Sequence, residues 1–203
     1  MTRIIENDSR ANFAKDLQRG EEGEEAVLSW LRSLSSVSEV IDCRKIYEWQ
    51  QKDIDFSVVL KPRSGFSFPV TKTWEVKTDT YPDINGTLSY EIVSNFQRGT
   101  IGCALKTQAD YIGFYCPQSR RLLYWKSQQL RDWVAQKSTD FELIKVFNYH
   151  KGGPEPQVTL CLKVPVEQAL ASCGGKAVVI DEVDEEIEAF EGLTWDIEKD
   201  IDY

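Results

Sequence analysis

The stretch Thr71-Lys-Thr-Trp-Glu-Val-Lys-Thr-Asp79 decides the fold that the sequence predicts. Side chains alternate along a strand, so Glu75 and Lys77 project to the same face, about 7 Å apart along the chain. Trp74 and Val76 project to the opposite face. The stretch therefore predicts a strand with one charged face and one apolar face.

The preceding predicted strand, from Asp53 to Leu60, alternates in the same way. Asp53 and Asp55 share one face, and the apolar residues between and after them project to the other. If the two strands pair as a hairpin, these carboxylates lie beside Glu75 and Lys77. Clustered carboxylates repel one another, so the pattern indicates a divalent cation, and Mg²⁺ is the natural candidate because it takes one or two carboxylates and keeps waters.

A predicted helix from Asp16 to Leu34 supplies a third acidic group. At 3.6 residues per turn, Glu24 lies on the apolar stripe of this helix. A carboxylate in an apolar setting is costly unless another group satisfies it. The stripe consists of Val27, Leu28, Leu31 and Leu34.

The other elements complete an α/β pattern in which a sheet begins as a meander. Turns that contain glycine and proline separate the predicted helices and strands. Further strands are expected from Glu39 to Trp49, Val70 to Thr78, Tyr111 to Tyr115, Leu122 to Trp125 and Val158 to Val164, and helices from Ser127 to Gln136 and Pro165 to Ala171.

The rest of the composition excludes several classes of chemistry. The single histidine, His150, excludes paired-histidine catalysis and histidine-rich zinc sites. The five scattered cysteines form neither a metal-binding nor a redox motif and are expected to be reduced, mostly buried thiols. We therefore expect a cytoplasmic protein, with neither a signal peptide nor a membrane-spanning segment.

The net charge of −9 is unevenly distributed. Residues 181–203 hold eleven acids and one lysine, which leaves 22 acids and 23 basic residues in the remainder. We expect a main domain over residues 1–175 and an acidic extension over residues 176–203. The extension is expected either to fold away from the cleft or to cover it as a polyanion that competes with DNA.

These pieces together resemble the PD-(D/E)XK nuclease superfamily, which includes restriction endonucleases and Holliday-junction resolvases. The matching residues occur in the family's order: Gly20-x-x-x-Glu24, then Asp55 before an apolar run, then Glu75-Val-Lys77. The family often has a proline before the aspartate, where this chain has Ile54. The resemblance is closest to small phage-type or resolvase-like members.

The resemblance implies a restriction-endonuclease-like mixed sheet flanked by helices and a catalytic set of Glu24, Asp55, Glu75 and Lys77. Asp55 and Glu75 would be the metal ligands for Mg²⁺, with Mn²⁺ able to substitute, and Lys77 would orient or activate the attacking water. Glu24 would support the metal or its waters. The secondary candidates for the site are Asp53, the alternative ligand to Asp55, and Glu91.

The expected activity is that of a hydrolase, a metal-dependent endonuclease acting on DNA, with RNA not excluded. Arg98 and Lys106 are the candidates for phosphate contacts. Basic residues that could line the same groove are Arg120, Arg121, Lys126, Arg131, Lys145 and Lys151, but no basic run is dense enough to count as a binding motif. No membrane partner is expected, and a homodimer stays open. The alternative is a non-catalytic nucleic-acid-binding or regulatory protein on the same fold, since fold does not guarantee activity.

Overall fold

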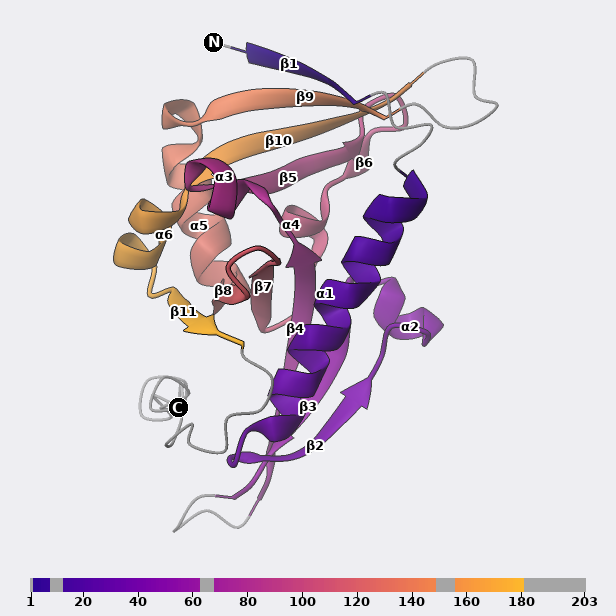
Figure 1. The fold of residues 1–203 in the computed structure, drawn as a ribbon, viewed down its shortest axis with the longest axis vertical. Helices are drawn as coiled ribbons and strands as arrows, with labels where there is room; N and C mark the ends of the chain where they lie inside the picture. Colours follow the sequence, from indigo (N-terminus) through magenta and orange to yellow (C-terminus); the bar gives the residue numbers. More distant parts are fainter. Residues whose placement is uncertain (1, 8–12, 63–67, 149–155, 181–203) are drawn as a thin grey trace, which may run out of the picture.

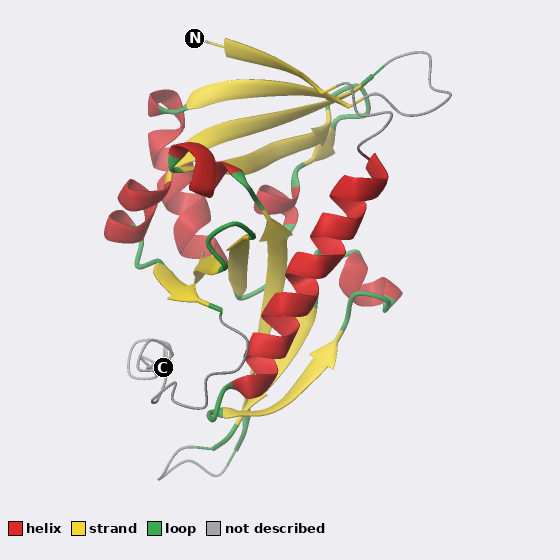
Figure 2. Cartoon of the chain, in the orientation of Figure 1, coloured by secondary structure: helices red, strands yellow, loops and turns green. Residues whose placement is uncertain are grey.

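The computed structural model describes residues 2–7, 13–62, 68–148 and 156–180, with side chains from Leu17 onward in these ranges. The described chain forms two β-sheets with helices packed against them (Figure 1). One helix lies along the outer face of the larger sheet, and several shorter helices lie between the two sheets (Figure 2). The candidate site is built on the larger sheet.

The six-stranded sheet contains the charged strand that opens the sequence argument. Its strands are β2 (Val37–Asp42), β3 (Phe56–Leu60), β4 (Val70–Thr78), β7 (Tyr111–Cys116), β8 (Arg121–Lys126) and β11 (Lys176–Val179). Their order across the sheet is β11-β8-β7-β4-β3-β2. Strands β4 and β7 pair in parallel, and the other neighbours pair antiparallel.

The five-stranded sheet has the order β1-β9-β10-β5-β6. Its strands are β1 (Thr2–Asn7), β5 (Thr87–Asn95), β6 (Thr100–Ile101), β9 (Glu142–Asn148) and β10 (Gln157–Pro165). Here β1 and β9 are the parallel pair. Each sheet therefore mixes parallel and antiparallel pairs, and the predicted α/β class with a mixed sheet is confirmed.

Helix α1 is much longer than the other helices and follows the predicted helix closely. The helices are α1 (Phe13–Ser33), α2 (Tyr47–Gln50), α3 (Tyr81–Asn85), α4 (Cys103–Lys106), α5 (Ser127–Lys137) and α6 (Val166–Ser172), with a 3₁₀ turn at Ser138–Asp140. None of these described helices has the length and apolarity that a membrane crossing requires.

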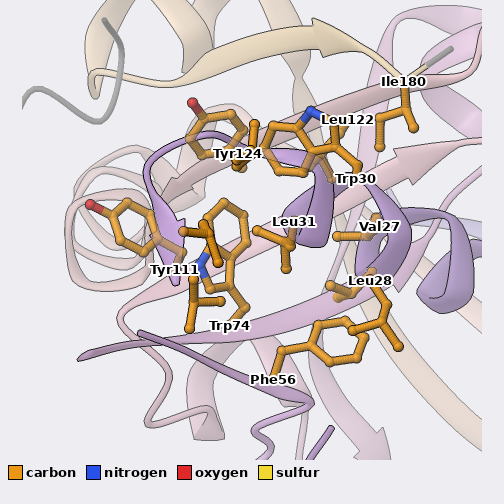
Figure 3. Packing of buried hydrophobic residues seen from close by; sticks show 14 of the residues in the cluster. Val27, Leu28, Trp30, Leu31, Phe56, Trp74, Tyr111, Leu122, Tyr124 and Ile180 are labelled. Atoms are coloured by element: carbon orange, nitrogen blue, oxygen red, sulfur yellow. The ribbon is translucent and has the colours of Figure 1, made fainter. Parts of the chain in front are cut away.

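Helix α1 packs on the apolar face of the six-stranded sheet. Its stripe residues are buried, as predicted, and Trp30 meets Trp74 of β4 edge to face with ring centroids 6.2 Å apart. Tyr111 of β7 stacks on Trp74 at 4.9 Å. Figure 3 shows these rings with Leu31 and Phe56 in one continuous core. Trp74 therefore lies at the centre of the layer that holds the charged strand in place.

A second core fills the space between the sheets. Ile112 and Phe114 of β7 contribute to it from the six-stranded sheet, and Leu88 and Tyr90 of β5 from the other. Leu130 and other apolar side chains of the short helices complete it. The face of β4 that carries Glu75 and Lys77 therefore points toward protein rather than toward open solvent, which the alternation of residues did not predict.

Two predicted strands have wrong boundaries. The strand expected from Glu39 to Trp49 ends at Asp42, and α2 follows it. A short run of mixed apolar and polar residues fits the period of a strand or of a helix. Here the amide of Cys43 donates to the carbonyl of Asp55 at 2.8 Å and closes a turn. The strand expected from Asp53 begins at Phe56. Asp53 has a φ of 49°, which is incompatible with extended pairing.

The five-stranded sheet was not predicted as a second sheet. In β5 polar and apolar residues alternate only from Thr87 to Ile92, and in β9 the apolar residues come in adjacent pairs, Leu143-Ile144 and Val146-Phe147; most side chains of both strands are only half-buried. Neither therefore contains the continuous apolar run that identifies a strand buried on both faces. The parallel pairing of β1 with β9 joins residues about 140 positions apart in sequence, and no local pattern encodes such a pairing.

The predicted C-terminal extension begins inside the sheet. Strand β11 pairs with β8, and Ile180 is buried in the core beneath α1. Residues 181–203, which carry the acidic charge, lie outside the described residues, as does His150. The five cysteines are free, and all except Cys103 are buried, which confirms the prediction that most of them are buried.

The contact between α1 and β4 depends on Gly23. A Cβ atom there would lie 2.0 Å from Oγ1 of Thr78 and 3.0 Å from a ring carbon of Tyr115, whereas at Gly20 no described atom lies within 4 Å of the added carbon. We expect Gly23→Ala to lower the free energy of unfolding by about 1–3 kcal/mol through overpacking. Gly20→Ala, the matched control, should raise it by up to about 1 kcal/mol through helix propensity. Urea unfolding of both variants measures this, and equal effects would contradict the close packing.

Candidate active site

The candidate site forms where β4 continues beyond the end of its pairing with β3. The last pair between these strands joins Phe56 to Trp74. On its other side β4 remains paired with β7 as far as Thr78. The residues of β4 that follow Trp74 therefore pair with β7 along one edge. The turn before β3 lies against their other edge.

Asp55 occupies the position where the ladder between β3 and β4 stops. Its amide donates to the carbonyl of Trp74 at 2.8 Å, and its carboxylate Oδ2 accepts from the amide of Val76 at 2.7 Å. Burial raises the pKa of Asp55, while Lys77 and the Val76 amide act in the opposite direction. The carboxylate is thus fixed by the backbone of β4.

Glu75 lies within hydrogen-bonding reach of Asp55 and is almost completely buried, with 2% of its side chain exposed. Its Oε1 accepts from Nζ of Lys77 at 2.5 Å. Burial raises the pKa of Glu75 to about 8, with a further contribution from the charge of Asp55, although Lys77 opposes both. A raised pKa in a carboxyl pair is typical of two groups that share a proton or that form an empty cation site.

Lys77 connects the buried carboxyl pair to solvent. Burial alone would lower its pKa, but Cys103, Glu75 and Asp55 raise the pKa above the usual value. The side chain remains 41% exposed. Lys77 is therefore a fixed positive charge at the surface of the site.

Glu24 approaches from helix α1. Burial raises the pKa of Glu24, as does the charge of Asp55, whereas Arg44 and Lys77 lower it. The sequence places four residues in one site: Glu24, Asp55, Glu75 and Lys77. They lie close enough for the charge of one to shift the pKa of another. The order of the elements and the alternation of β4 predicted this proximity.

A cleft of about 410 Å³ opens beside Lys77. Glu24 of α1 lines it, together with Val76 and Lys77 from the end of β4. Asp55 and Glu75 do not line the cleft. They contact two residues that do, Val76 and Lys77. The other lining residues are Arg19, Gly20, Thr78, Asp79, Thr80, Tyr81, Ser89, Glu91, Cys103, Ala104 and Phe114.

Arg44 is a member of the site that the sequence did not predict. Its guanidinium bonds both carboxylate oxygens of Asp42, at 2.9 and 2.6 Å, and lies 3.1 Å from Glu25 and 3.4 Å from Glu24. It also stacks over the ring of Phe56 at 5.2 Å. Arg44 thus holds Glu24 in place, and no local sequence pattern marks it, because its partners come from α1, β2 and β3.

The two secondary candidates, Asp53 and Glu91, make different contacts. Asp53 pairs with Lys106 at 3.0 Å, and its carbonyl accepts from the hydroxyl of Thr107 at 2.7 Å, which anchors the turn before Asp55. Glu91 lines the cleft and accepts from the amide of Cys103 at 3.2 Å. The structure thus brings Asp55 rather than Asp53 into contact with Glu75.

The two basic residues predicted to contact phosphate do not line the cleft. Arg98 is exposed in the turn between β5 and β6, where its amide donates to Asn95 at 3.0 Å. Lys106 is held by Asp53 at the end of α4. Arg19 is the basic residue that lines the cleft besides Lys77, and it was not singled out in the sequence.

The donor set at the site suits a hard cation. Within the described ranges no group of three or more histidine, cysteine and acidic side chains is arranged to hold a metal ion. Asp55 and Glu75 nevertheless offer two adjacent carboxylates, and Mg²⁺ takes one or two carboxylates and completes its shell with water. The residues present therefore fit Mg²⁺ and do not fit a closed structural metal site.

Comparison of the chain with protein-family models, with curated proteins and with solved structures finds no match.

The raised pKa of Glu75 predicts a pH dependence of stability in metal-free protein. In the folded state Glu75 keeps its proton up to about pH 8, against an ordinary value of 4.5. Its contribution to stability is full below about pH 4.5 and is lost as the pH rises to about 8.

Urea unfolding in EDTA between pH 4 and pH 9 measures this loss. Glu75→Gln, which cannot ionise, should lack this component of the decline. Glu25→Gln, which removes a carboxylate 59% exposed on the same side of the site, should retain it. Parallel curves for the wild type and Glu75→Gln would contradict the assigned shift.

Proposed function

We propose that the protein is a Mg²⁺-dependent endonuclease that hydrolyses phosphodiester bonds in DNA, with Mn²⁺ able to replace Mg²⁺ and RNA as the alternative substrate. One observation carries this proposal: the carboxyl pair of half-buried Asp55 and buried Glu75 is in contact with Lys77, at the edge of a cleft that Glu24 also lines. Phosphodiester hydrolysis without histidine requires two acids, a fixed positive charge and access to solvent, and this site offers all three.

Asp55 and Glu75 would hold the metal ion. A bound Mg²⁺ would polarise a phosphate oxygen and lower the pKa of a coordinated water. The two carboxyl groups share a burial penalty that raises both pKa values. They would give up any retained proton when the cation binds, so metal affinity should rise with pH through this range.

Lys77 would act on the attacking water and on the transition state. Its ammonium group lies beside Glu75 and is partly exposed to the cleft, so it can orient a water molecule there. The same positive charge stabilises the negative charge that develops on the phosphate oxygens. Glu24, held by Arg44, would accept a hydrogen bond from water at the opposite side.

A non-catalytic protein on the same framework is the second candidate. The contact between Lys77 and the nearly buried Glu75 favours it, because the Lys77 ammonium already occupies a Glu75 oxygen that a metal ion would need. In that case the quartet would be a structural network that holds α1 against β4. Metal binding separates the two candidates.

Cleavage of supercoiled plasmid in Mg²⁺ and in Mn²⁺ tests the enzyme. We expect Asp55→Asn and Lys77→Met each to lower the rate at least about 10²-fold, as removal of a group that stabilises developing charge does. The matched controls are Glu25→Gln and Lys137→Met, which remove exposed charges outside the cleft and should leave the rate unchanged. Cleavage that survives both site substitutions would refute the assignment of the site.

Calorimetric titration with Mn²⁺ in the absence of DNA tests the metal site by itself. We expect saturable heat from the wild type and a loss of at least about tenfold in affinity for Glu75→Gln, since each 1.4 kcal/mol of lost binding free energy is tenfold. Metal binding without cleavage would favour the non-catalytic candidate. Heat that does not depend on Glu75 would refute the metal site.

A further inference from the structure

A second cleft, of about 430 Å³, lies toward the opposite end of β4. It is bounded by the start of β4, the start of β7 and the junction between β8 and α5. The lining residues that matter here are Lys72, Asp110, Lys126, Ser127, Gln128 and Arg131. This second cleft shares no residue with the cleft beside Lys77.

The charge of the second cleft is positive on balance. Lys72, Lys126 and Arg131 contribute three cations against the single carboxylate of Asp110. That carboxylate is engaged by β4, because its Oδ2 accepts from the amide of Thr73 at 2.8 Å and from the Thr73 hydroxyl at 3.0 Å. The lining therefore favours an anionic occupant.

Helix α5 begins at this cleft. Its amide at Ser127 donates to the carbonyl of Asp110 at 2.9 Å. The following amides of the first turn, at Gln128 and Gln129, have no acceptor within the helix by its geometry. A helix start of this kind adds positive potential and directed donors for an anion.

An independent observation points to a ligand. Among the described side chains, three buried polar atoms lack a hydrogen-bond partner: Oγ of Ser36, Oγ of Ser127 and Nε of Arg131. Two of the three belong to residues that line this cleft and lie one helical turn apart on α5. Buried polar groups are nearly always satisfied, so two such groups at one cleft indicate a missing acceptor.

Neighbouring contacts fix the geometry of Arg131. Its two terminal nitrogens donate to the side-chain oxygen of Gln128 at 2.9 Å and to the carbonyl of Thr107 at 2.7 Å. These bonds hold the guanidinium plane and leave Nε as the guanidinium nitrogen without an acceptor. Ser127 is only 5% exposed, so bulk water does not satisfy its hydroxyl.

We propose that the second cleft binds a phosphate group. The hydroxyl of Ser127, Nε of Arg131 and the first free amides of α5 donate to its oxygens, and Lys72 and Lys126 balance its charge. A phosphate carries several acceptor oxygens, which matches several convergent donors better than a single-acceptor anion does. The site takes either a free or terminal phosphate or a diester of a nucleic acid, and it does not depend on catalysis at Glu75.

The second cleft is separate from the cleft beside Lys77. Lys72 and Lys77 are five residues apart on β4, about 17 Å along the strand, and alternation places their side chains on opposite faces of the sheet. A phosphate of a nucleic acid held near α5 would position the strand without reading its bases, because phosphate contacts set register rather than sequence.

Titration with inorganic phosphate, followed by amide resonances in EDTA at constant ionic strength, tests the site. We expect saturable shifts at Gln128 and Gln129 in the wild type, and about tenfold weaker binding in Ser127→Ala, the effect of losing one hydrogen bond to a charged group. Ser127→Ala should fold normally, because the deleted hydroxyl makes no hydrogen bond in the ligand-free protein. The matched control is Ser36→Ala, which deletes the third unpartnered hydroxyl and should bind like the wild type.

Oligonucleotides distinguish the two sources of phosphate. Single-stranded DNA with a 5′-phosphate that binds more tightly than the same strand with a 5′-hydroxyl identifies a terminal phosphate site, whereas equal and Ser127-dependent affinities identify a diester site. Glu75→Gln should retain phosphate binding, which separates this proposal from the proposed nuclease activity. The absence of saturable shifts, or equal affinities for the wild type and Ser127→Ala, would overturn it.

Discussion

The hydrogen bond from the Val76 amide to the carboxylate of Asp55 is the constraint on which the candidate site depends. Strand β3 pairs with β4 only as far as Phe56, and at the next position a side-chain oxygen replaces a backbone acceptor. This substitution ends the ladder and buries a carboxylate beside Glu75. If β3 extended further, as the sequence predicts, Asp55 would lie on the face of a sheet and would not reach the edge of β4.

The resulting concentration of negative charge explains the groups that surround it. Burial raises the pKa values of Asp55, Glu75 and Glu24, and Lys77 and Arg44 offset part of that cost. Lys77 supplies its charge from β4 itself, whereas Arg44 ties Glu24 of α1 to the turn after β2. The close packing of α1 on β4 at Gly23 keeps these groups within reach of one another. The electrostatics of the site therefore depend on the packing of the core.

The sequence predicted the parts of this arrangement that follow from local periodicity. The bounds of β4, the buried stripe of α1 and the proximity of the three acids Glu24, Asp55 and Glu75 to Lys77 come from alternation, helical phase and chain order. The five-stranded sheet, Arg44 and the cleft at α5 could not be predicted in this way. Each depends on contacts between distant segments: Arg44 meets groups about 20 residues away, and Ser127 meets Asp110 and the start of β4 only in the folded chain.

The most direct test of the central claim is a crystal structure of the protein grown with Mn²⁺, with anomalous diffraction used to locate the ion. The account predicts an anomalous peak bound by carboxylate oxygens of both Asp55 and Glu75, with Lys77 released from its direct contact with Glu75. A structure at full Mn²⁺ saturation that shows no peak at these carboxylates, with the pair between Lys77 and Glu75 unchanged, would contradict it.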